Sequence, residues 1–219
     1  GARCDVESMQ YSYQFSPELQ QEWQWTERFA AQPEILNYAN HVADRFGLRG
    51  DIDFDTRITS AVYDEAAKCW KLTSEDGRDY TGRYCIMATG CLSSPNTPHF
   101  EGIEDFEGDV YHTGNWPHQK VDFTGRRVAI IGTGSSAVQS TPVIASEAEK
   151  LYVFQRTPHW VVPAHNKPLD PDVMNDWKSH YPERRAAAKQ NFSGILANYR
   201  KDKAVETPAE ERRAEYERR

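Results

Sequence analysis

Apolar residues recur at helical spacing in one early segment of the chain. The stripe ends just before Gly47, a residue suited to a helix terminus, and the Pro-Glu pair at 33–34 favours a helix start. A shorter helix is predicted after the Ser-Pro-Glu sequence at 16–18, where the serine can act as an N-cap. We expect the stripe to face a core, and it comprises Ile35, Tyr38, Ala39, Val42 and Phe46.

After these helices the pattern changes to short β-prone runs. Turn signals at 64–66 and 76–77 separate three runs and predict a β-meander, with strands at Ile58–Tyr63, Cys69–Thr73 and Tyr80–Met87. The last run leads into Ala88, Thr89 and Gly90, whose small side chains allow the backbone to approach a ligand closely.

A different order of elements begins after a proline-containing linker at 94–98. Arg127–Ile131 is typical of a short buried strand, and a glycine-rich stretch, a helix to about Glu149 and a second strand at Leu151–Gln155 follow it. This order predicts the start of a βαβ unit. Pro142 should kink the helix or end its first part, because proline has no backbone N–H to donate.

Composition excludes several classes of protein. The 33 acidic and 26 basic side chains give a formal charge of −7, which repels phosphate backbones, so we expect no nucleic-acid partner. No apolar run approaches the ~20 residues that span a bilayer and no signal peptide is present, so we expect no membrane contact and a cytoplasmic location. Beyond Pro163 the chain is polar, and a capping box at 207–210 predicts a charged surface helix.

The cysteines indicate neither a metal site nor a redox dithiol. They show no C-x-x-C pair and no histidine at metal-ligand spacing, and they are Cys4, Cys69, Cys85 and Cys91. We therefore expect no metal and reduced thiols.

The glycine-rich stretch between the two strands has the G-x-G-x-x-A pattern of a dinucleotide-binding turn. Gly132 permits the tight turn, and Gly134 lets a pyrophosphate approach the backbone. Ser135, Ser136 and Ala137 open the helix, whose N–H groups can bind anionic oxygens. The strand before and the helix after favour this interpretation over a purely structural glycine turn.

The residues after the second strand discriminate between the two nicotinamide coenzymes. An NAD-binding unit places Asp or Glu there to bind the ribose 2′-hydroxyl, whereas this chain has Arg156 and Thr157. A guanidinium can bind a 2′-phosphate in two places, so the sequence favours NADPH. The alternative is an arginine that is merely exposed.

The most specific motif precedes this unit. It reads F-x-G-x-x-x-H-x-x-x-W-P, formed by Phe106, Gly108, His112, Trp116 and Pro117, and it resembles the fingerprint of type I Baeyer–Villiger monooxygenases. Related flavin monooxygenases usually carry Tyr or Phe where Trp116 stands. Within that family, the sequence resembles the phenylacetone and cyclohexanone monooxygenases.

Two further segments extend the resemblance. Residues 1–5 look like the end of the family's G-x-x-x-D signature, which would place Asp5 near the flavin, where the family's aspartate supports a catalytic arginine. The segment Ala88, Thr89 and Gly90 matches the family's hinge between its flavin and NADP domains. The resemblance thus implies catalytic roles for Asp5, His112 and Trp116.

The resemblance also implies an α/β fold with two dinucleotide-binding, Rossmann-like domains. Residues 1–97 would be a portion of the FAD domain with its β-meander, 98–165 the fingerprint linker and the start of the NADP domain, and 166–219 a truncated helical insertion. In such enzymes NADPH reduces FAD, and one oxygen atom of O2 is inserted beside a ketone carbonyl to give an ester or lactone. FAD, NADPH, O2 and a ketone are the expected cofactors and partners.

Three alternatives stay open at this point. A sister flavin monooxygenase would oxidise nitrogen or sulfur, although Trp116 and Pro117 argue against it. A pyridine nucleotide disulfide reductase would need a cysteine pair, and a non-catalytic module would bind NADP without turnover. The chain opens with Gly1 instead of Met and stops at Arg219 within a helical pattern, so we expect an internal fragment that is inactive alone.

Overall fold

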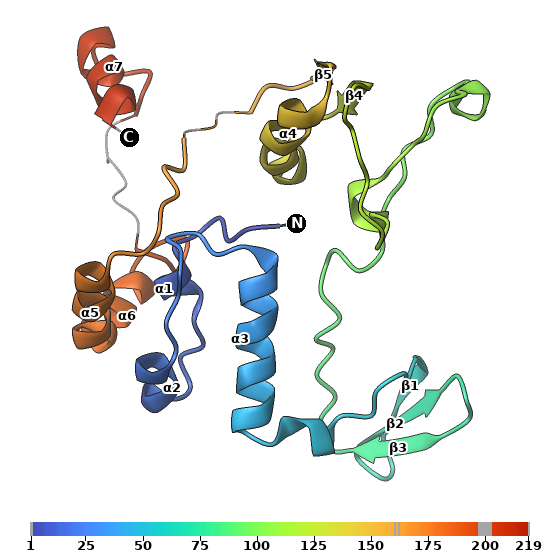
Figure 1. The fold of residues 1–219 in the computed structure, drawn as a ribbon. Helices are drawn as coiled ribbons and strands as arrows, with labels where there is room; N and C mark the ends of the chain where they lie inside the picture. The colour runs from blue at the N-terminus through green and yellow to red at the C-terminus, as the bar shows by residue number, and fades with distance from the viewer. Residues whose placement is uncertain (1, 160, 162, 197–202, 219) are drawn as a thin grey trace. The chain divides into compact units, whose positions relative to one another are not determined.

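The protein is described by a computed structural model that covers residues 2–159, 161, 163–196 and 203–218 (Figure 1). The chain forms two compact units. The first contains Gly1–Phe46 and Phe123–Arg219, and the second contains Gly47–Asp122. Each unit is described separately below.

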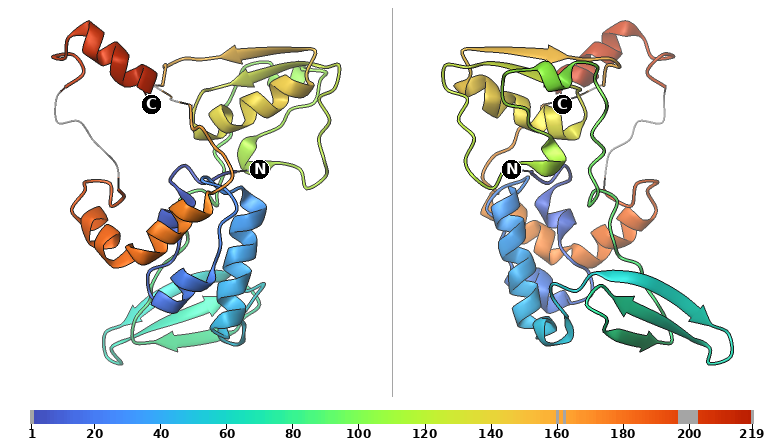
Figure 2. Two further views of the ribbon diagram at one scale, coloured as in Figure 1. Left: turned by 60° about the vertical axis from the view of Figure 1, so that its left-hand side comes forward. Right: turned by 90° about the vertical axis from the view of Figure 1, so that its right-hand side faces the viewer.

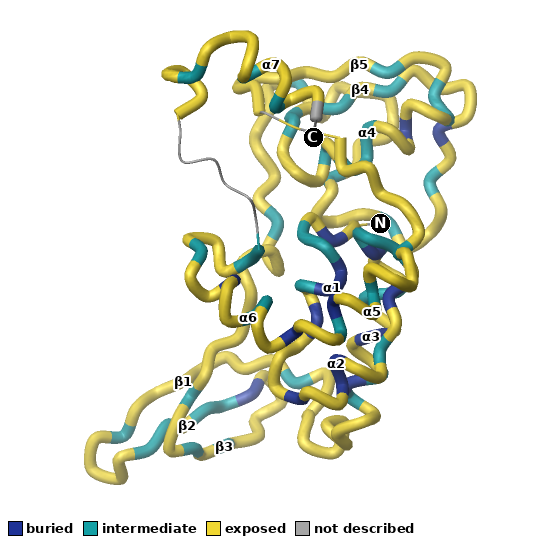
Figure 3. The backbone as a smooth tube through the Cα atoms, turned by 90° about the vertical axis from the view of Figure 1, so that its left-hand side faces the viewer, coloured by how far each residue is buried: buried dark blue, intermediate teal, exposed yellow. Residues whose placement is uncertain are grey.

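The main core of the first unit joins two segments that are far apart in the sequence. Helices α1 to α3 come from the early segment and α5 and α6 from the late one; their bounds are Ser8–Tyr11, Pro17–Glu22, Gln32–Arg45, Pro171–Ser179 and Tyr181–Lys189. Figure 3 shows buried backbone gathered where these helices meet. The buried cluster consists of Cys4, Met9, Leu19, Trp25, Ala30, Tyr38, Val42, Trp177 and Tyr181.

Local signals explain where the early helices begin and end. The Ser16 hydroxyl accepts a hydrogen bond from the Leu19 N–H at 3.1 Å, which is the predicted N-cap of α2. Helix α3 ends before Gly47, whose φ of +64° is the left-handed conformation that favours glycine. Both helices are confirmed, and Tyr38 and Val42 of the predicted stripe are buried. Ile35 is half-buried, whereas Ala39 and Phe46 are exposed, so the stripe faces the core only in part.

A half-buried arginine attaches α6 to the segment around α1. The Arg185 guanidinium donates hydrogen bonds to the carbonyls of Gln10 at 2.7 Å, Ser12 at 3.0 Å and Met9 at 3.1 Å. Burial lowers the pKa of Arg185, because the charged form loses its hydration. These bonds satisfy the carbonyls at the end of α1, a helix of one turn that has few bonds of its own.

A βαβ unit forms the other ordered part of the first unit. Strands β4 (Arg127–Ile131) and β5 (Lys150–Phe154) pair in parallel, and α4 (Ser135–Glu147) packs on one side of them (Figure 2). The predicted unit is confirmed, and α4 continues through Pro142, so of the two expected effects, a kink or an end, the end does not occur. One lost N–H bond is tolerated because the remaining turns of the helix stay bonded. Helix α7 (Ala209–Arg218) begins within the predicted capping box at 207–210.

The second unit contains the predicted meander. Strands β1 (Ile58–Asp64), β2 (Cys69–Ser74) and β3 (Asp79–Gly82) are antiparallel in the order β1-β2-β3. Short 3₁₀ helices lie at Leu48–Asp51, Ile103–Asp105 and Thr113–Asn115.

The third strand is shorter than predicted. It ends at Gly82 instead of Met87, because Gly82 pairs with Trp70 and β2 offers only Cys69 beyond that position. The following side chains are largely exposed, with Ile86 88% accessible and Met87 77% accessible. The sequence of residues 83–87 therefore favours a strand, but the pairing between β2 and β3 does not extend to these residues. Among the described residues, no helix has the length and apolar character needed to cross a membrane.

Candidate nucleotide-binding site

The turn after β4 adopts a conformation that only glycine accepts readily. Gly132 has a φ of +103°, and its N–H donates to the Phe154 carbonyl at 2.8 Å, which joins the turn to the end of β5. The Gln155 amide donates to the Thr133 hydroxyl at 2.9 Å. The ends of both strands and the turn are thus held together at one edge of the sheet.

The second glycine of the turn is not required by the chain itself. Gly134 has φ −73° and ψ 177°, which any residue can adopt, and a Cβ built on it would meet no atom within 4 Å. A glycine that neither backbone nor packing demands fits a position where a ligand approaches the main chain.

The helix after the glycines presents unsatisfied donors. Gly134 is the N-cap residue of α4, and within the described part of the chain no side chain caps the helix. The first N–H groups of a helix have no intrahelical acceptor, so those of Ser135, Ser136 and Ala137 are available to an anionic oxygen. Ser135 and Ser136 are exposed. The helix dipole adds a partial positive charge at this end.

The residues predicted to select the coenzyme follow β5 at the same edge. Arg156 and Thr157 come two and three residues after Phe154, which is bonded to Gly132, and both are exposed. The structure therefore brings the predicted turn and the predicted 2′-phosphate residues to one side of the βαβ unit.

The fingerprint segment lies in the second unit, where its residues contact one another and Pro95. The Nδ1 atom of His112 accepts a hydrogen bond from the Gly114 N–H at 3.1 Å. A Cβ on Gly114 would lie 2.8 Å from Pro95 Cβ, and one on Gly108 would lie 2.6 Å from the Phe106 ring. The glycine at the third position of the motif therefore leaves room for the phenylalanine at the first.

The geometry of His112 defines the imidazole tautomer. Because Nδ1 accepts the Gly114 hydrogen bond, the neutral ring carries its proton on Nε2, which can donate to another group. Trp116 lies beside Tyr111 with ring centroids 5.5 Å apart. The motif thus presents a hydrogen-bond donor and an aromatic face four residues apart.

The remaining predicted site residues are exposed. Asp5 lies in the first unit directly after the buried Cys4, while Ala88, Thr89 and Gly90 lie in the second unit, where Gly90 has a φ of +70°. Gly1, the first residue of the predicted signature, lies outside the described residues. Since Asp5 and the hinge segment belong to separate units, their common role at a flavin stays a prediction.

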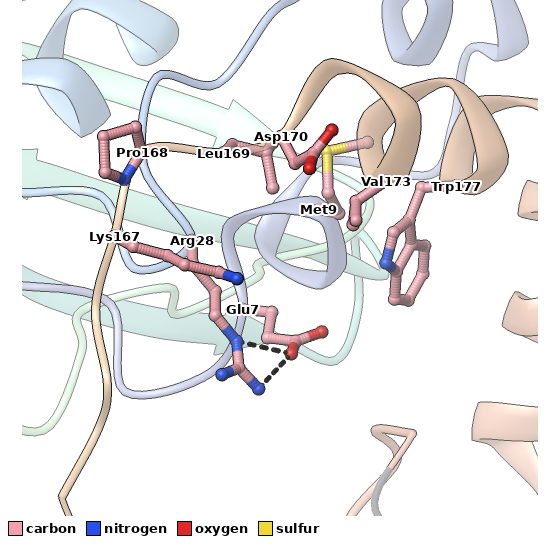
Figure 4. A pocket seen from close by; sticks show the side chains of 9 residues that line it. All are labelled: Glu7, Met9, Arg28, Lys167, Pro168, Leu169, Asp170, Val173 and Trp177. Atoms are coloured by element: carbon pink, nitrogen blue, oxygen red, sulfur yellow. Dashed lines mark hydrogen bonds and ion pairs between the residues drawn. The ribbon is translucent and has the colours of Figure 1, made fainter.

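A cavity lies elsewhere in the first unit. Figure 4 shows the Glu7–Arg28 ion pair and the Trp177 ring among its walls, and its volume is about 220 Å³. No predicted site residue lines it, and it is smaller than the several hundred Å³ typical of cofactor pockets.

The described part of the chain contains neither a metal-binding cluster nor a disulfide. No group of three or more His, Cys, Asp or Glu side chains is placed to hold a metal there. The four cysteines are free thiols, and Cys4 is buried, which raises its pKa.

Comparisons with known proteins match the whole chain. A family profile described as pyridine nucleotide-disulphide oxidoreductase matches residues 7–214. Acetone monooxygenase (methyl acetate-forming) from Gordonia sp. (strain TY-5) is 39% identical over 99% of this chain and 40% of its own length. The chain spans 34% and 40% of the length of the first two curated relatives it matches.

Two solved structures share the fold along the chain. The structure of an oxidized steroid monooxygenase bound to NADP is 52% identical with a TM-score of 0.87, covering 100% of this chain and 42% of that one. The OTEMO complex with FAD and NADP is 38% identical with a TM-score of 0.86, covering 99% of this chain and 42% of that one.

Proposed function

Because the chain belongs to the pyridine nucleotide-disulphide oxidoreductase family and is homologous to Baeyer–Villiger monooxygenases, we propose that the protein inserts one oxygen atom of O2 beside a ketone carbonyl. FAD and NADPH are its cofactors. The observation that carries this proposal is the 52% identity, over the full chain, to a steroid monooxygenase bound to NADP. The acetone relative supports the reaction class, since its name describes conversion of a ketone into an ester.

The βαβ unit is the proposed binding site for NADPH. Gly132 provides the turn, Gly134 leaves space for the pyrophosphate, and the α4 N–H groups bind its oxygens. Arg156 and Thr157 bind the 2′-phosphate and select NADPH over NADH. The fit rests on the conformation of the turn and on the uncapped helix N-terminus, which exist without any ligand.

When bound, NADPH supplies a hydride to the flavin, and the reduced flavin activates O2. The chain's own contribution is to hold and orient these groups. In this proposal Asp5 and the segment Ala88, Thr89 and Gly90 lie near the flavin. His112 accepts a hydrogen bond within the fingerprint segment at Nδ1 and can donate one from Nε2, and Trp116 supports that segment with its ring.

The proposed division of the chain follows from this assignment. Residues 1–97 contribute to an FAD domain, 98–165 contain the fingerprint and the start of the NADP domain, and 166–219 form part of a helical insertion. We propose a cytoplasmic protein with no nucleic-acid partner, in keeping with the formal charge of −7.

The test is a substrate screen on the purified protein in its complete reading frame. Cyclic and linear ketones are supplied with NADPH and O2, and esters or lactones are identified by gas chromatography with mass spectrometry. Ester formation coupled to NADPH oxidation is expected. If amines or thioethers are oxidised and ketones are not, the N- or S-oxidising alternative holds; NADP binding with no turnover of any substrate supports the non-catalytic module.

A further inference from the structure

Arg3 connects two separate parts of the first unit, and it lies two residues before Asp5. Residues 2–4 are extended, and their backbone pairs with residues 30–32: the Cys4 N–H donates to the Ala30 carbonyl at 2.9 Å, and the Gln32 N–H donates to the Ala2 carbonyl at 2.7 Å. In an extended segment, alternate residues bond to opposite sides. The backbone groups of Arg3 therefore face away from residues 30–32.

The side chain of Gln139 occupies that other side. Its Oε1 atom accepts from the Arg3 N–H at 2.9 Å, and its Nε2 atom donates to the Arg3 carbonyl at 3.5 Å. One amide thus bonds both backbone groups of one residue, as a neighbouring β-strand would. Gln139 lies on α4, five residues after Gly134 of the proposed nucleotide turn, and it is half-buried.

The side chain of Arg3 makes a second connection, to residues 27 and 29, which in turn bond to the segment that follows β5. Its guanidinium donates to Glu27 and to the Phe29 carbonyl, the latter at 3.1 Å. Glu27 also accepts from the Asn166 amide, whose oxygen accepts the Phe29 N–H at 2.9 Å.

The segment around Asn166 is itself paired with the segment around Glu27. The Arg28 N–H donates to the Lys167 carbonyl at 3.0 Å, and the Leu169 N–H donates to the Thr26 carbonyl at 2.9 Å. Two parts of the βαβ region are thus bonded near Arg3. Helix α4 bonds Arg3 itself through Gln139, and the chain after β5 bonds residues 26–29, two of which bind the Arg3 side chain.

We propose that Gln139 is a positioning residue that ties the Asp5 segment to the nucleotide-binding helix. The inference rests on the proposed function for the identity of the nucleotide, but the bond itself is independent of it. Binding of NADP at the α4 N-terminus restrains α4, and through Gln139 it restrains residues 2–5. The position of Asp5 then responds to the coenzyme although the two are not in contact.

The test is hydrogen exchange of the peptide that covers residues 2–8, in the complete protein, with and without NADP⁺. The variant Gln139→Leu keeps the size of the side chain and removes both hydrogen bonds. Exchange at Arg3 should become ~10-fold faster, because a lost pair of bonds lowers the cost of local opening. In the wild type NADP⁺ should slow this exchange, and in Gln139→Leu it should not.

Two further variants serve as a matched control and as a replacement in case Gln139→Leu misfolds. Gln24→Leu makes the same chemical change at an exposed glutamine that has no hydrogen bond to a described residue, and it should exchange like the wild type. Gln139→Asn retains an amide that is one methylene too short to reach Arg3. It should behave like Gln139→Leu, and it replaces that variant if the leucine misfolds.

Wild-type exchange in both Gln139 variants, or equally fast exchange in Gln24→Leu, overturns the role of Gln139. Failure of the proposed function gives a different result. If the wild type binds no NADP⁺ by calorimetry, the nucleotide assignment is wrong, while the comparison of variants without nucleotide still decides whether Gln139 holds residues 2–5.

Discussion

The two glycines of the nucleotide turn should respond in opposite ways to the same added methyl group. In Gly132→Ala the methyl meets no atom within 4 Å, so the penalty comes only from forcing alanine to a φ of +103°. A strained conformation of this kind costs about 1–3 kcal/mol. For a domain of this size that corresponds to a fall in Tm of roughly 2–12 °C.

Gly134→Ala should leave the protein without nucleotide intact. Its φ of −73° suits alanine and the space around it is open, so stability should be unchanged or higher by about 0.4–1 kcal/mol, since alanine restricts the unfolded chain. The same methyl lies where the pyrophosphate must approach. NADPH binding should weaken by ~10-fold, or about 1.4 kcal/mol.

Thermal unfolding without nucleotide and calorimetric titration with NADP⁺ separate these effects. Gly132→Ala should lower Tm before any ligand is added, whereas Gly134→Ala should lose only the rise in Tm that NADP⁺ produces. A Gly134→Ala protein that melts as early as Gly132→Ala, or binds NADP⁺ like the wild type, would refute the assignment of the two glycines.

Four other perturbations test separate parts of the description. Arg156→Ala should weaken NADPH binding by about 1–3 kcal/mol and leave NADH unaffected in steady-state kinetics; equal losses would remove Arg156 from the 2′-phosphate site. His112→Ala should reduce ester formation at least ~10-fold with normal flavin content, measured as ester formed against NADPH consumed and peroxide released. Trp177→Ala removes a nearly buried ring from the helical core and should cost about 3–5 kcal/mol in thermal or urea unfolding; a loss below 1 kcal/mol would contradict its place in the core. The hydrogen bond from Arg184 lowers the pKa of Asp176, so their ion pair stabilises the fold at pH values above the carboxyl's unfolded pKa. This stabilisation is lost as the pH falls through the folded pKa. Asp176→Asn should therefore lower Tm at pH 7 and match the wild type at the acid end of the range.

Periodicity and turn chemistry predicted most of the local structure. The strand Arg127–Ile131 and the capped start at Pro17 agree with the structure, because each depends on residues that are neighbours in the chain. The prediction that the third strand reaches Met87 was wrong beyond Gly82, because the end of a strand depends on residues that are distant in the chain. A strand needs a partner, and the β-propensity of residues 83–87 contains no information on how far the neighbouring strand extends.

The sequence could predict the candidate site where its residues directly follow predicted strands. The glycine turn and Arg156 follow two consecutive strands, so their common edge follows from the parallel βαβ order. The Gln139 link to Arg3 could not be read from the sequence. It joins residues 136 positions apart, and a glutamine on a helix carries no pattern that distinguishes a bonded amide from a solvated one.

The helical core cannot be completed until late in the protein's synthesis, because its residues come from both ends of the chain. Tyr38 and Val42 leave the ribosome well before Trp177 and Tyr181, which complete the same buried cluster. At roughly 5–20 residues per second, the early half of the core waits about 7 to 28 s for the late half. During that interval Tyr38 can pack on Trp23 and Trp25, but the buried cluster still lacks Trp177 and Tyr181. The nascent chain should therefore be a substrate for ribosome-associated chaperones, and slowing translation between residues 46 and 177 should increase its aggregation.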